Sequence, residues 1–276
     1  MQRGSLFDQL PDDSPAIINA DDPRGPALVA DVARPVTYAI DSRADVAPVQ
    51  LNLSLDGIAM VVRTTRGTLH LQSRLLGRGN TYNILAAATT CAALDVPFRE
   101  IEEGVRALST VPGRMQIVSG DDDDVTVIVD YAHTDDALRT LLEAARPLTP
   151  GRVVTVFGCG GDRDATKRPL MGAVAARCSD QVIITSDNPR SEDPLHIIAD
   201  IERGLGGSVE TSWLAITDRG EAIARAIREA QPGDLVVIAG KGHERHQVIG
   251  RRTLPFEDAS VVRAELIRRR TGSQVG

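Results

Sequence analysis

The sequence predicts an α/β protein whose carboxyl-terminal part is a doubly wound, Rossmann-like domain. After residue 123, short runs rich in Val and Ile alternate with helix-like segments. These runs are apolar on both faces, which is typical of a parallel sheet covered by helices on each side. Three of the runs lead into Gly- or Pro-containing loops that carry charged residues. Because ligands of open α/β sheets bind at the carboxyl ends of the strands, we expect a binding site there.

Each element of this part follows from its local pattern. The expected strands are Val125–Val129, Val153–Phe157, Gln181–Thr185 and Asp234–Ala239. The expected helices are Asp135–Ala145, Leu170–Cys178, Leu195–Leu205, Gly220–Ala230 and Glu257–Arg268. The first of these helices has a clear start. Thr134 is a suitable N-cap, and Asp135 and Asp136 place negative charge in the first turn.

The residues before Pro112 follow a different pattern. A short strand is expected at Ala16–Asn19, and helices at Asn80–Leu94 and Phe98–Leu108. Alternating runs with turns at Asp56-Gly57 and Arg66-Gly67 predict antiparallel hairpins, with strands at Val49–Leu55, Ile58–Thr64 and Gly67–Ser73. We therefore expect two domains, residues 1–112 and 113–276, of which the first lacks partners for a sheet of ordinary width.

Composition limits the classes of partner. The net charge of −7 and the pI near 5.3 argue against nucleic-acid binding. The run Arg268–Arg270 is interpreted as the solvated end of a helix, where the dipole favours cations. Three cysteines without metal-ligand spacing indicate a reducing compartment. No run is long and apolar enough for a membrane span, and the first residues lack a signal-peptide pattern. We expect a cytoplasmic protein without nucleic-acid or membrane partners.

The loop Thr185–Arg190 is the most informative stretch. Pro189 stiffens the turn, so Asp187, Asn188 and Arg190 have one fixed arrangement. A carboxylate, an amide and a guanidinium suit a ligand with both ammonium and carboxylate groups. A polar surface loop is the simpler alternative.

Two further loops favour the binding interpretation. Phe157–Met171 contains three glycines and the charged Arg163, and Gly240–Glu244 follows the last expected strand. Glycines allow close approach of the backbone to a ligand, and guanidinium groups bind carboxylate or phosphate. Neither loop has the spacing of a Walker A motif. Each could be only a tight turn, but three charged loops after strands of one sheet favour a shared site.

The motifs together resemble the Mur ligase family over almost the whole chain. The resemblance rests on seven segments in matching order and spacing: Ala20-Asp21-Asp22, Asn80–Asn83, Pro112–Met115, Asp130–Thr134, Gly158–Met171, Asp187–Arg190 and Gly240–Glu244. The Asp-Asn-Pro-Arg loop is similar to the motif of the branch that adds meso-diaminopimelate to UDP-N-acetylmuramoyl-L-alanyl-D-glutamate. This implies an ATP- and Mg²⁺-dependent amide ligase of peptidoglycan precursor synthesis, in which an acyl phosphate is attacked by an amino group.

The resemblance also implies roles for single residues. Asn83 is expected at the adenine, Arg114 at the nucleotide phosphates, Asp130 at the ribose, and His133 in the nucleotide cleft. Asp187, Asn188, Arg190, Gly240 and Glu244 are expected at diaminopimelate, with Arg163 at its other end. Arg190 would pair with the distal carboxylate that lysine lacks, and Glu244 with the adjacent ammonium. Alternatively, Asn83 is a helix cap, Asp130 a turn residue and His133 an ordinary loop histidine. No catalytic residue is assigned.

Some family features do not occur in this sequence. The Walker-type loop, the preceding uridine-nucleotide domain and the metal ligands of the family have no counterpart here, and Arg3 stands near the family's modified lysine. We therefore expect a partial central ATPase domain before the acceptor domain, metal ligands in an amino-terminal portion or a separate chain, and no ligation by this chain alone. The alternatives are a non-catalytic diaminopimelate- or muropeptide-binding module, and a related amide ligase of the folylpolyglutamate or cyanophycin type.

Overall fold

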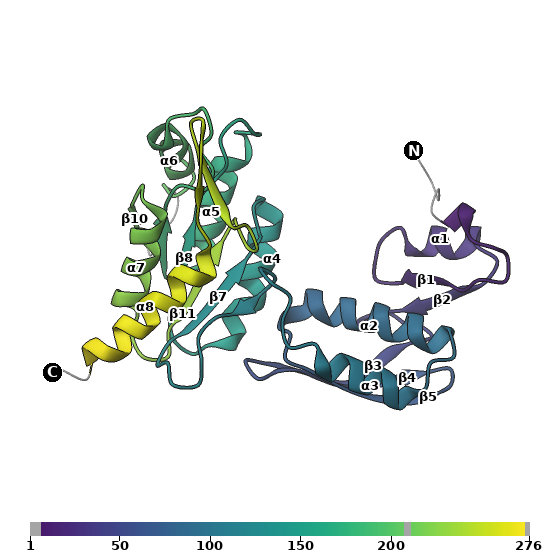
Figure 1. Cartoon of the computed structure of the whole chain (residues 1–276). Coiled ribbons are helices and arrows are strands. Elements are labelled where there is room, and N and C mark those ends of the chain that lie inside the picture. Colours follow the sequence, from purple (N-terminus) through teal and green to yellow (C-terminus); the bar gives the residue numbers. More distant parts are fainter. Residues whose placement is uncertain (1–6, 207–210, 274–276) are drawn as a thin grey trace. The chain divides into compact units, whose positions relative to one another are not determined.

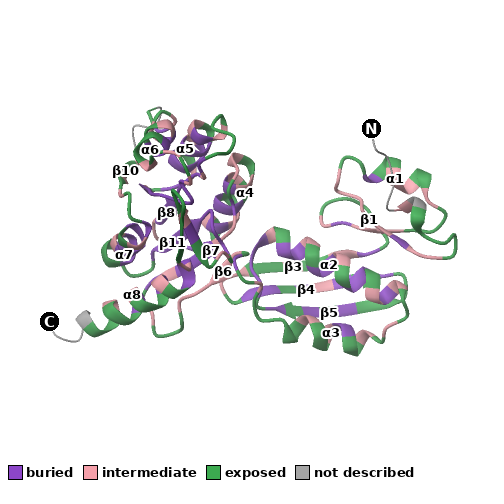
Figure 2. Cartoon of the chain, turned by 45° about the horizontal axis from the view of Figure 1, so that its top comes forward, coloured by how far each residue is buried: buried purple, intermediate pink, exposed green. Residues whose placement is uncertain are grey.

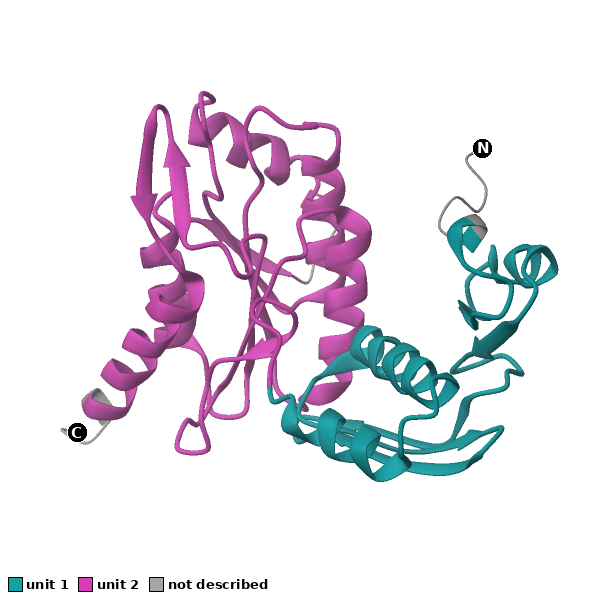
Figure 3. Ribbon diagram, turned by 45° about the vertical axis from the view of Figure 1, so that its right-hand side comes forward, with its two compact units in different colours: residues 1–109 teal, residues 110–276 magenta. Residues whose placement is uncertain are grey.

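The computed structural model describes residues 7–206 and 211–273. The chain forms two compact units, residues 1–109 and 110–276 (Figure 3). The boundary expected from the sequence lies three residues later, at residues 112 and 113. Both units combine helices with strands, so the expected α/β class is confirmed.

The first unit contains two separate small sheets. Strands β1 (Ala16–Asn19) and β2 (Pro35–Tyr38) pair in parallel, and the short helix α1 (Gly25–Asp31) connects them. Strands β3 (Ala47–Ser54), β4 (Gly57–Thr64) and β5 (Gly67–Ser73) form an antiparallel sheet. Helices α2 (Gly77–Ala93) and α3 (Phe98–Ala107) pack against this unit's strands, and a 3₁₀ turn at Phe7–Gln9 precedes β1. Of these elements, β2 and α1 were not expected.

The hairpins of this unit were predicted correctly, but their turns lie one residue earlier than expected. Ser54 pairs with Gly57 and Thr64 with Gly67, so Gly57 begins a strand instead of closing a turn, and Gly67 begins β5 as its expected strand bounds had it. Gly57 has φ of +124°, and a Cβ there would lie 1.9 Å from the Ser73 carbonyl oxygen. The close approach of β4 to the end of β5 therefore requires this glycine.

The second unit is the expected doubly wound domain. Its sheet has the order β10-β9-β8-β11-β7-β6, with parallel pairing except at β6. Helices α4, α5 and α6 cover one face, and α7 and α8 the other (Figure 1). The strands are β6 (Gln116–Ile117), β7 (Thr126–Asp130), β8 (Val153–Phe157), β9 (Gln181–Ile184), β10 (Ser212–Ala215) and β11 (Leu235–Ala239). The helices are α4 (Asp135–Ala145), α5 (Lys167–Cys178), α6 (Pro194–Glu202), α7 (Arg219–Glu229) and α8 (Asp258–Ser273), with a 3₁₀ turn at Arg146–Leu148.

The core of this unit lies in the middle of the sheet. Every residue of β8 and β11 is buried, which agrees with sequences that are apolar except for Thr155 (Figure 2). Residues of α7 and α8, among them Ile223, Ile227 and Val262, pack on one face of these strands. The N-cap of α4 is also as predicted, since the Thr134 hydroxyl accepts a hydrogen bond from the Ala137 backbone N–H.

A two-stranded hairpin was not expected from the sequence. Strands β12 (His246–Ile249) and β13 (Arg252–Pro255) pair antiparallel between β11 and α8. Most of their side chains are exposed, so the hairpin adds little to the core. Its importance lies in its contacts with the loop after β9. None of the helices within residues 7–206 and 211–273 is long and apolar enough to cross a membrane.

Candidate functional site

The loops after β8, β9 and β11 meet at the carboxyl edge of the sheet, as the sequence predicted. The Gly161 N–H donates to the Asn188 carbonyl over 2.9 Å, which joins the first loop to the second. The Asn188 amide nitrogen donates to Glu244 Oε2 over 2.9 Å, which joins the second to the third. A Cβ on Gly158 would lie 2.1 Å from the Thr185 carbonyl oxygen, so only glycine permits this approach between the loops.

A compact polar cluster lies at the centre of this edge. It consists of Asp187, Asn188, Lys241 and Glu244. The Lys241 ammonium lies 2.8 Å from Glu244 Oε2, 3.0 Å from Asn188 Oδ1 and 3.4 Å from Asp187 Oδ1. Lys241 is fully buried, and Asp187 and Asn188 are nearly so. Asp187 and Asn188 were expected to face a ligand, but both have partners inside the protein. Their contact with a ligand therefore stays a prediction.

Glu244 is the most accessible acid of this cluster. Its side chain is 24% exposed, compared with 9% for Asp187. Burial raises the pKa of Glu244, but hydrogen bonds from Lys241 and Asn188 outweigh that effect and hold the pKa below its ordinary value. Glu244 is therefore ionised at neutral pH and can accept a hydrogen bond from a ligand ammonium.

Arg190 is held in an unusual backbone conformation next to the cluster. Its φ is +52°, a left-handed value that a side chain other than Gly or Asn rarely adopts. The hairpin maintains it, because the Arg190 N–H donates to the Val248 carbonyl and the Gly250 N–H donates to the Arg190 carbonyl. Nη1 of Arg190 donates to the Gly161 carbonyl over 2.7 Å. Among the described residues, Nε and Nη2 have no partner.

The remaining two residues expected at diaminopimelate lie beside this group. Gly240 has φ of +114°, and a Cβ there would lie 3.2 Å from Asp187 Oδ2. Arg163 is exposed on the loop after β8, where its Nη1 donates to the Asp162 carbonyl. A Cβ on Gly160 would lie 2.9 Å from Arg190 Nη1 and 3.8 Å from Arg163 Cγ, so the two arginines flank Gly160.

The expected nucleotide residues of the second unit lie at the end of β7. Asp130 accepts hydrogen bonds from the Met115 and Ala132 N–H groups at 2.7 and 2.8 Å. Burial raises the pKa of Asp130, and these hydrogen bonds offset only part of that rise, so its pKa stays above the ordinary value. Both oxygens thus fix the backbone, although each keeps a lone pair for a further donor. Asp130 therefore acts here as a turn residue, and its ribose contact stays a prediction.

Tyr131 organises the other side chains near this strand end. The exposed Arg114 guanidinium lies 4.8 Å from the Tyr131 ring centre, and the His133 and His243 rings lie 4.6 and 5.3 Å away. His133 is exposed, and its Nδ1 bonds with the Tyr131 carbonyl oxygen. Such an exposed cation beside an aromatic ring suits a phosphate or a base, but the geometry assigns neither.

Asn83 belongs to the first unit. It lies in the second turn of α2, exposed, with its amide nitrogen 3.3 Å from Asn80 Oδ1. It is not a helix cap, because α2 begins at Gly77. Its expected role at an adenine stays a prediction.

Sequence reasoning missed three buried cations around the site. Lys241 is the first. The Arg168 guanidinium binds Glu192 and Asp200 at 2.8 and 3.0 Å, and Arg219 binds both oxygens of Asp258. All three are at most 2% exposed. The only sequence signal was a basic residue in or next to a loop at a strand end, which does not distinguish a buried cation from a solvated one.

No metal centre is found in the part of the chain that the structure describes. Within residues 7–206 and 211–273, no group of three or more His, Cys, Asp or Glu side chains could hold a metal ion. The carboxylates that do gather near Lys241 and Arg168 are engaged by these cations. The described residues therefore offer no ready-made cluster of metal ligands, and no chemical step is assigned to Mg²⁺.

Comparison with known proteins accounts for both units. Residues 2–91 match the Mur ligase middle domain, and residues 113–242 match the glutamate ligase domain of Mur ligases. The chain belongs to the Mur ligase family. UDP-N-acetylmuramoyl-L-alanyl-D-glutamate–2,6-diaminopimelate ligase of Gloeobacter violaceus is 47% identical over 93% of this chain. The protein of the same name from Geobacillus thermodenitrificans is 43% identical over 92% of it.

These relatives are longer than this Mur ligase chain. The alignments span 52% of each of the two proteins. A solved structure of a UDP-N-acetylmuramoyl-L-alanyl-D-glutamate–2,6-diaminopimelate ligase superposes with a TM-score of 0.67 and 37% identity, over 93% of this chain and 54% of that one. Folylpolyglutamate synthase of Mycobacterium tuberculosis shares the fold, with a TM-score of 0.62 and 19% identity. The expected family and fold class are thereby confirmed.

Proposed function

We propose that this Mur ligase chain supplies the amino-acid acceptor site for ATP-dependent addition of meso-diaminopimelate to UDP-N-acetylmuramoyl-L-alanyl-D-glutamate. The observation that carries the proposal is that a carboxylate and a guanidinium both lie at one edge of the sheet. Glu244 presents a carboxylate, and Arg190 presents Nε and Nη2 that have no partner among the described residues. The names of the relatives that match at 43–47% identity support the same substrate.

The chemistry of the acceptor explains why both groups are needed. The distal end of diaminopimelate carries an ammonium and a carboxylate on one carbon. The Nε–Nη2 side of a guanidinium binds a carboxylate bidentately, and a carboxylate such as Glu244 accepts from the ammonium. Lysine carries the ammonium without the carboxylate, so it would leave Arg190 unpaired. Arg163, on the other side of Gly160, would hold the far end of the amino acid.

The nucleotide would bind at the other group of residues. We assign Arg114 to the phosphates, Asp130 to the ribose and His133 to the cleft. For the first unit, taken by itself, we propose Asn83 as an adenine contact. The exposed guanidinium of Arg114 beside Tyr131 supports the first assignment. Bound ATP would supply the phosphoryl group that activates the carboxylate of the dipeptide. Positioning of the acceptor amine is then the main contribution of the second unit to the reaction rate.

The test is direct binding of the amino acid to the purified chain. Chemical shifts of the ¹⁵N-labelled protein would be followed during titration with meso-diaminopimelate, L-lysine or L-glutamate. We expect the amides of Asn188, Arg190 and residues 240–244 to shift with meso-diaminopimelate at lower concentrations than with the other two. Equal responses to all three amino acids, or none, would reject the proposal.

A second measurement separates an enzyme from a binding module. The chain, ATP, Mg²⁺, the nucleotide-linked dipeptide and meso-diaminopimelate are incubated, and the tripeptide product is sought by mass spectrometry. The same mixture is repeated with the amino-terminal part of a full-length relative fused before residue 1. Binding with turnover only in the fusion supports an acceptor domain that works within a complete ligase. Binding without turnover in either favours the non-catalytic module.

A further inference from the structure

Lys241 has an environment that a surface lysine never has. Its side chain is 0% exposed, and its ammonium lies within 3.4 Å of oxygens from Asp187, Asn188 and Glu244. A buried ammonium needs several acceptors to replace water, and it has three here. Because it is covered, Lys241 cannot itself touch a substrate. Its effect must pass through the residues that it binds.

The first of these effects is on Asn188. Its Oδ1 accepts from the Lys241 ammonium and from the Val248 N–H, both at 3.0 Å. Both partners are donors only, so the side-chain oxygen must face them and the amide cannot be flipped. Its nitrogen then points to Glu244, where it donates to Oε2 over 2.9 Å.

The second effect is on Glu244. Its Oε2 receives two hydrogen bonds, from Lys241 and from Asn188. No described residue donates to its Oε1. One oxygen is therefore anchored inside the protein, and the other is left to accept from a ligand. The carboxylate is held in place before a ligand arrives, which reduces the entropy lost on binding.

We infer that Lys241 is a positioning residue, which locks Asn188 and Glu244 so that Glu244 offers a single oriented oxygen to the ammonium of an amino-acid ligand. The charges around the site fit a ligand end that is itself neutral. Lys241 and Arg190 contribute two positive charges, and Asp187 and Glu244 two negative ones. A zwitterionic end such as that of diaminopimelate keeps this balance, whereas the end of lysine adds an unbalanced positive charge. The choice of ligand rests on the proposed function, but the locking of Glu244 does not.

The chain allows an unusually direct test, because it contains two lysines, Lys167 and Lys241. After ¹⁵N-lysine labelling, two ammonium signals are expected. The Lys241 signal should exchange with water far more slowly than that of Lys167, which is half-buried and bonded to the His133 carbonyl. Equal exchange rates would overturn the inference without any mutation.

The titration of Glu244 gives the second readout. Its ¹³Cδ signal is assigned by its loss in Glu244→Gln. The groups that act on Glu244 include Lys241, His246 and the buried Arg219, and Asp187 shares the Lys241 ammonium with it. In Lys241→Met, Glu244 loses the cation that lowers its pKa, while its burial still raises the pKa. Its titration midpoint should therefore rise above the ordinary carboxyl value. Gln247→Met is the matched control, because it removes a bond to the Asp187 carbonyl without changing a charge, and should leave the midpoint in place.

The affinity for diaminopimelate then tests whether the positioning by Lys241 affects ligand binding. We expect Lys241→Met to weaken meso-diaminopimelate binding at least tenfold, and Gln247→Met to weaken it less. If the wild-type chain binds no diaminopimelate while the exchange and titration results hold, the proposed function fails and the positioning role stands. If the wild-type chain binds it, and Lys241→Met changes neither the midpoint nor the affinity, the positioning role fails. If Lys241→Met does not fold, the lysine exchange rates decide.

Discussion

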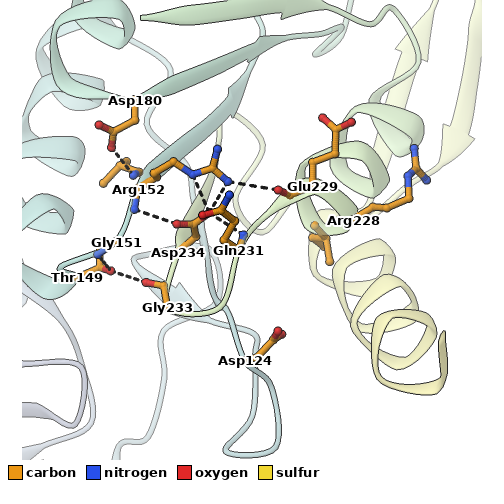
Figure 4. A network of polar contacts seen from close by, with 12 residues as sticks. Asp124, Thr149, Gly151, Arg152, Asp180, Arg228, Glu229, Gln231, Gly233 and Asp234 are labelled. Atoms are coloured by element: carbon orange, nitrogen blue, oxygen red, sulfur yellow. Dashed lines mark hydrogen bonds and ion pairs between the residues drawn. The ribbon is translucent and has the colours of Figure 1, made fainter. Parts of the chain in front are cut away.

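Arg152 and Asp234 join two neighbouring strands at their amino ends, opposite the candidate site. Nε and Nη2 of Arg152 donate to Asp234 Oδ2 at 3.0 and 2.7 Å, and the Arg152 N–H donates to Oδ1 at 2.9 Å. Figure 4 shows this carboxylate at the centre of a network that also reaches the Gln231 backbone. Arg152 precedes β8 and Asp234 precedes β11, so the pair fixes the register of the two most buried strands.

Replacing Asp234 should reveal its contribution to stability. Asp234→Asn keeps the shape but removes the charge, and we expect a loss of about 1–3 kcal/mol in the free energy of unfolding. Burial raises the pKa of Asp234, but bonds from Arg152 and Gln231 outweigh it and keep the pKa low. A lowered pKa contributes stability that is present above the unfolded value near pH 4 and lost as the pH falls through the folded value. The difference between variant and wild type should therefore shrink in acid.

The measurement is urea unfolding across a pH series. Glu229→Gln is the control, because its half-exposed carboxylate pairs with Arg225 on the surface of α7, and solvent-exposed pairs contribute little to stability. A loss for Asp234→Asn no greater than that of the control, or one that grows as the pH falls, contradicts the assignment.

The buried pair of Arg219 and Asp258 should respond more strongly. Both side chains are 0% exposed, and the guanidinium binds the two oxygens at 2.7 and 2.8 Å. Arg219→Met leaves the Asp258 carboxylate buried without its cation, which typically costs about 3–5 kcal/mol. Adding Asp258→Leu removes the stranded charge, so the double variant should recover part of the loss in thermal unfolding. A double variant as unstable as the single one would show that the carbonyl contacts of Arg219 dominate instead.

Arg190 should carry the discrimination between meso-diaminopimelate and L-lysine. Loss of a charge-assisted hydrogen-bonded pair typically costs about 1.5–3 kcal/mol, or roughly ten- to hundredfold in affinity. We expect Arg190→Ala to lose that preference in binding titrations, and Arg190→Lys to recover little of it because an ammonium lacks the planar fork. Arg177→Ala, which removes an exposed guanidinium from the end of α5, should change nothing. An unchanged preference in Arg190→Ala would move the distal carboxylate away from this loop.

Residues 110–276 should fold by themselves. They contain a complete six-stranded sheet with helices on both faces and a core of their own. Expressed without residues 1–109, they should give a dispersed NMR spectrum and a single cooperative thermal transition. In the full chain, limited proteolysis near Val111–Arg114 should leave a resistant carboxyl-terminal fragment. Degradation of both units at the same rate would argue against two independent units.

The sequence by itself determined the parts of this protein that depend on local pattern. The apolar runs of β8 and β11, the hairpins at Gly57 and Gly67, and the Thr134 cap follow from periodicity and capping chemistry, which act over a few residues. Because ligands bind at the carboxyl ends of parallel strands, the sequence also predicted that Arg190 and Glu244 lie at the same edge of the sheet.

The tertiary structure decided which charged groups are covered and which are free. The short edge strand β10 and the hairpin β12–β13 were missed, since their few residues are stabilised by distant partners. Arg268 and Arg270 are exposed at the end of α8, as expected, whereas Arg269 is mostly covered and binds Asp124. Lys241 lies in a glycine turn, where a charged side chain is usually exposed. It is nevertheless buried, with its ammonium bound to Asp187 and Glu244. Burial and ion pairing depend on residues far apart in the chain, and no local pattern encodes them.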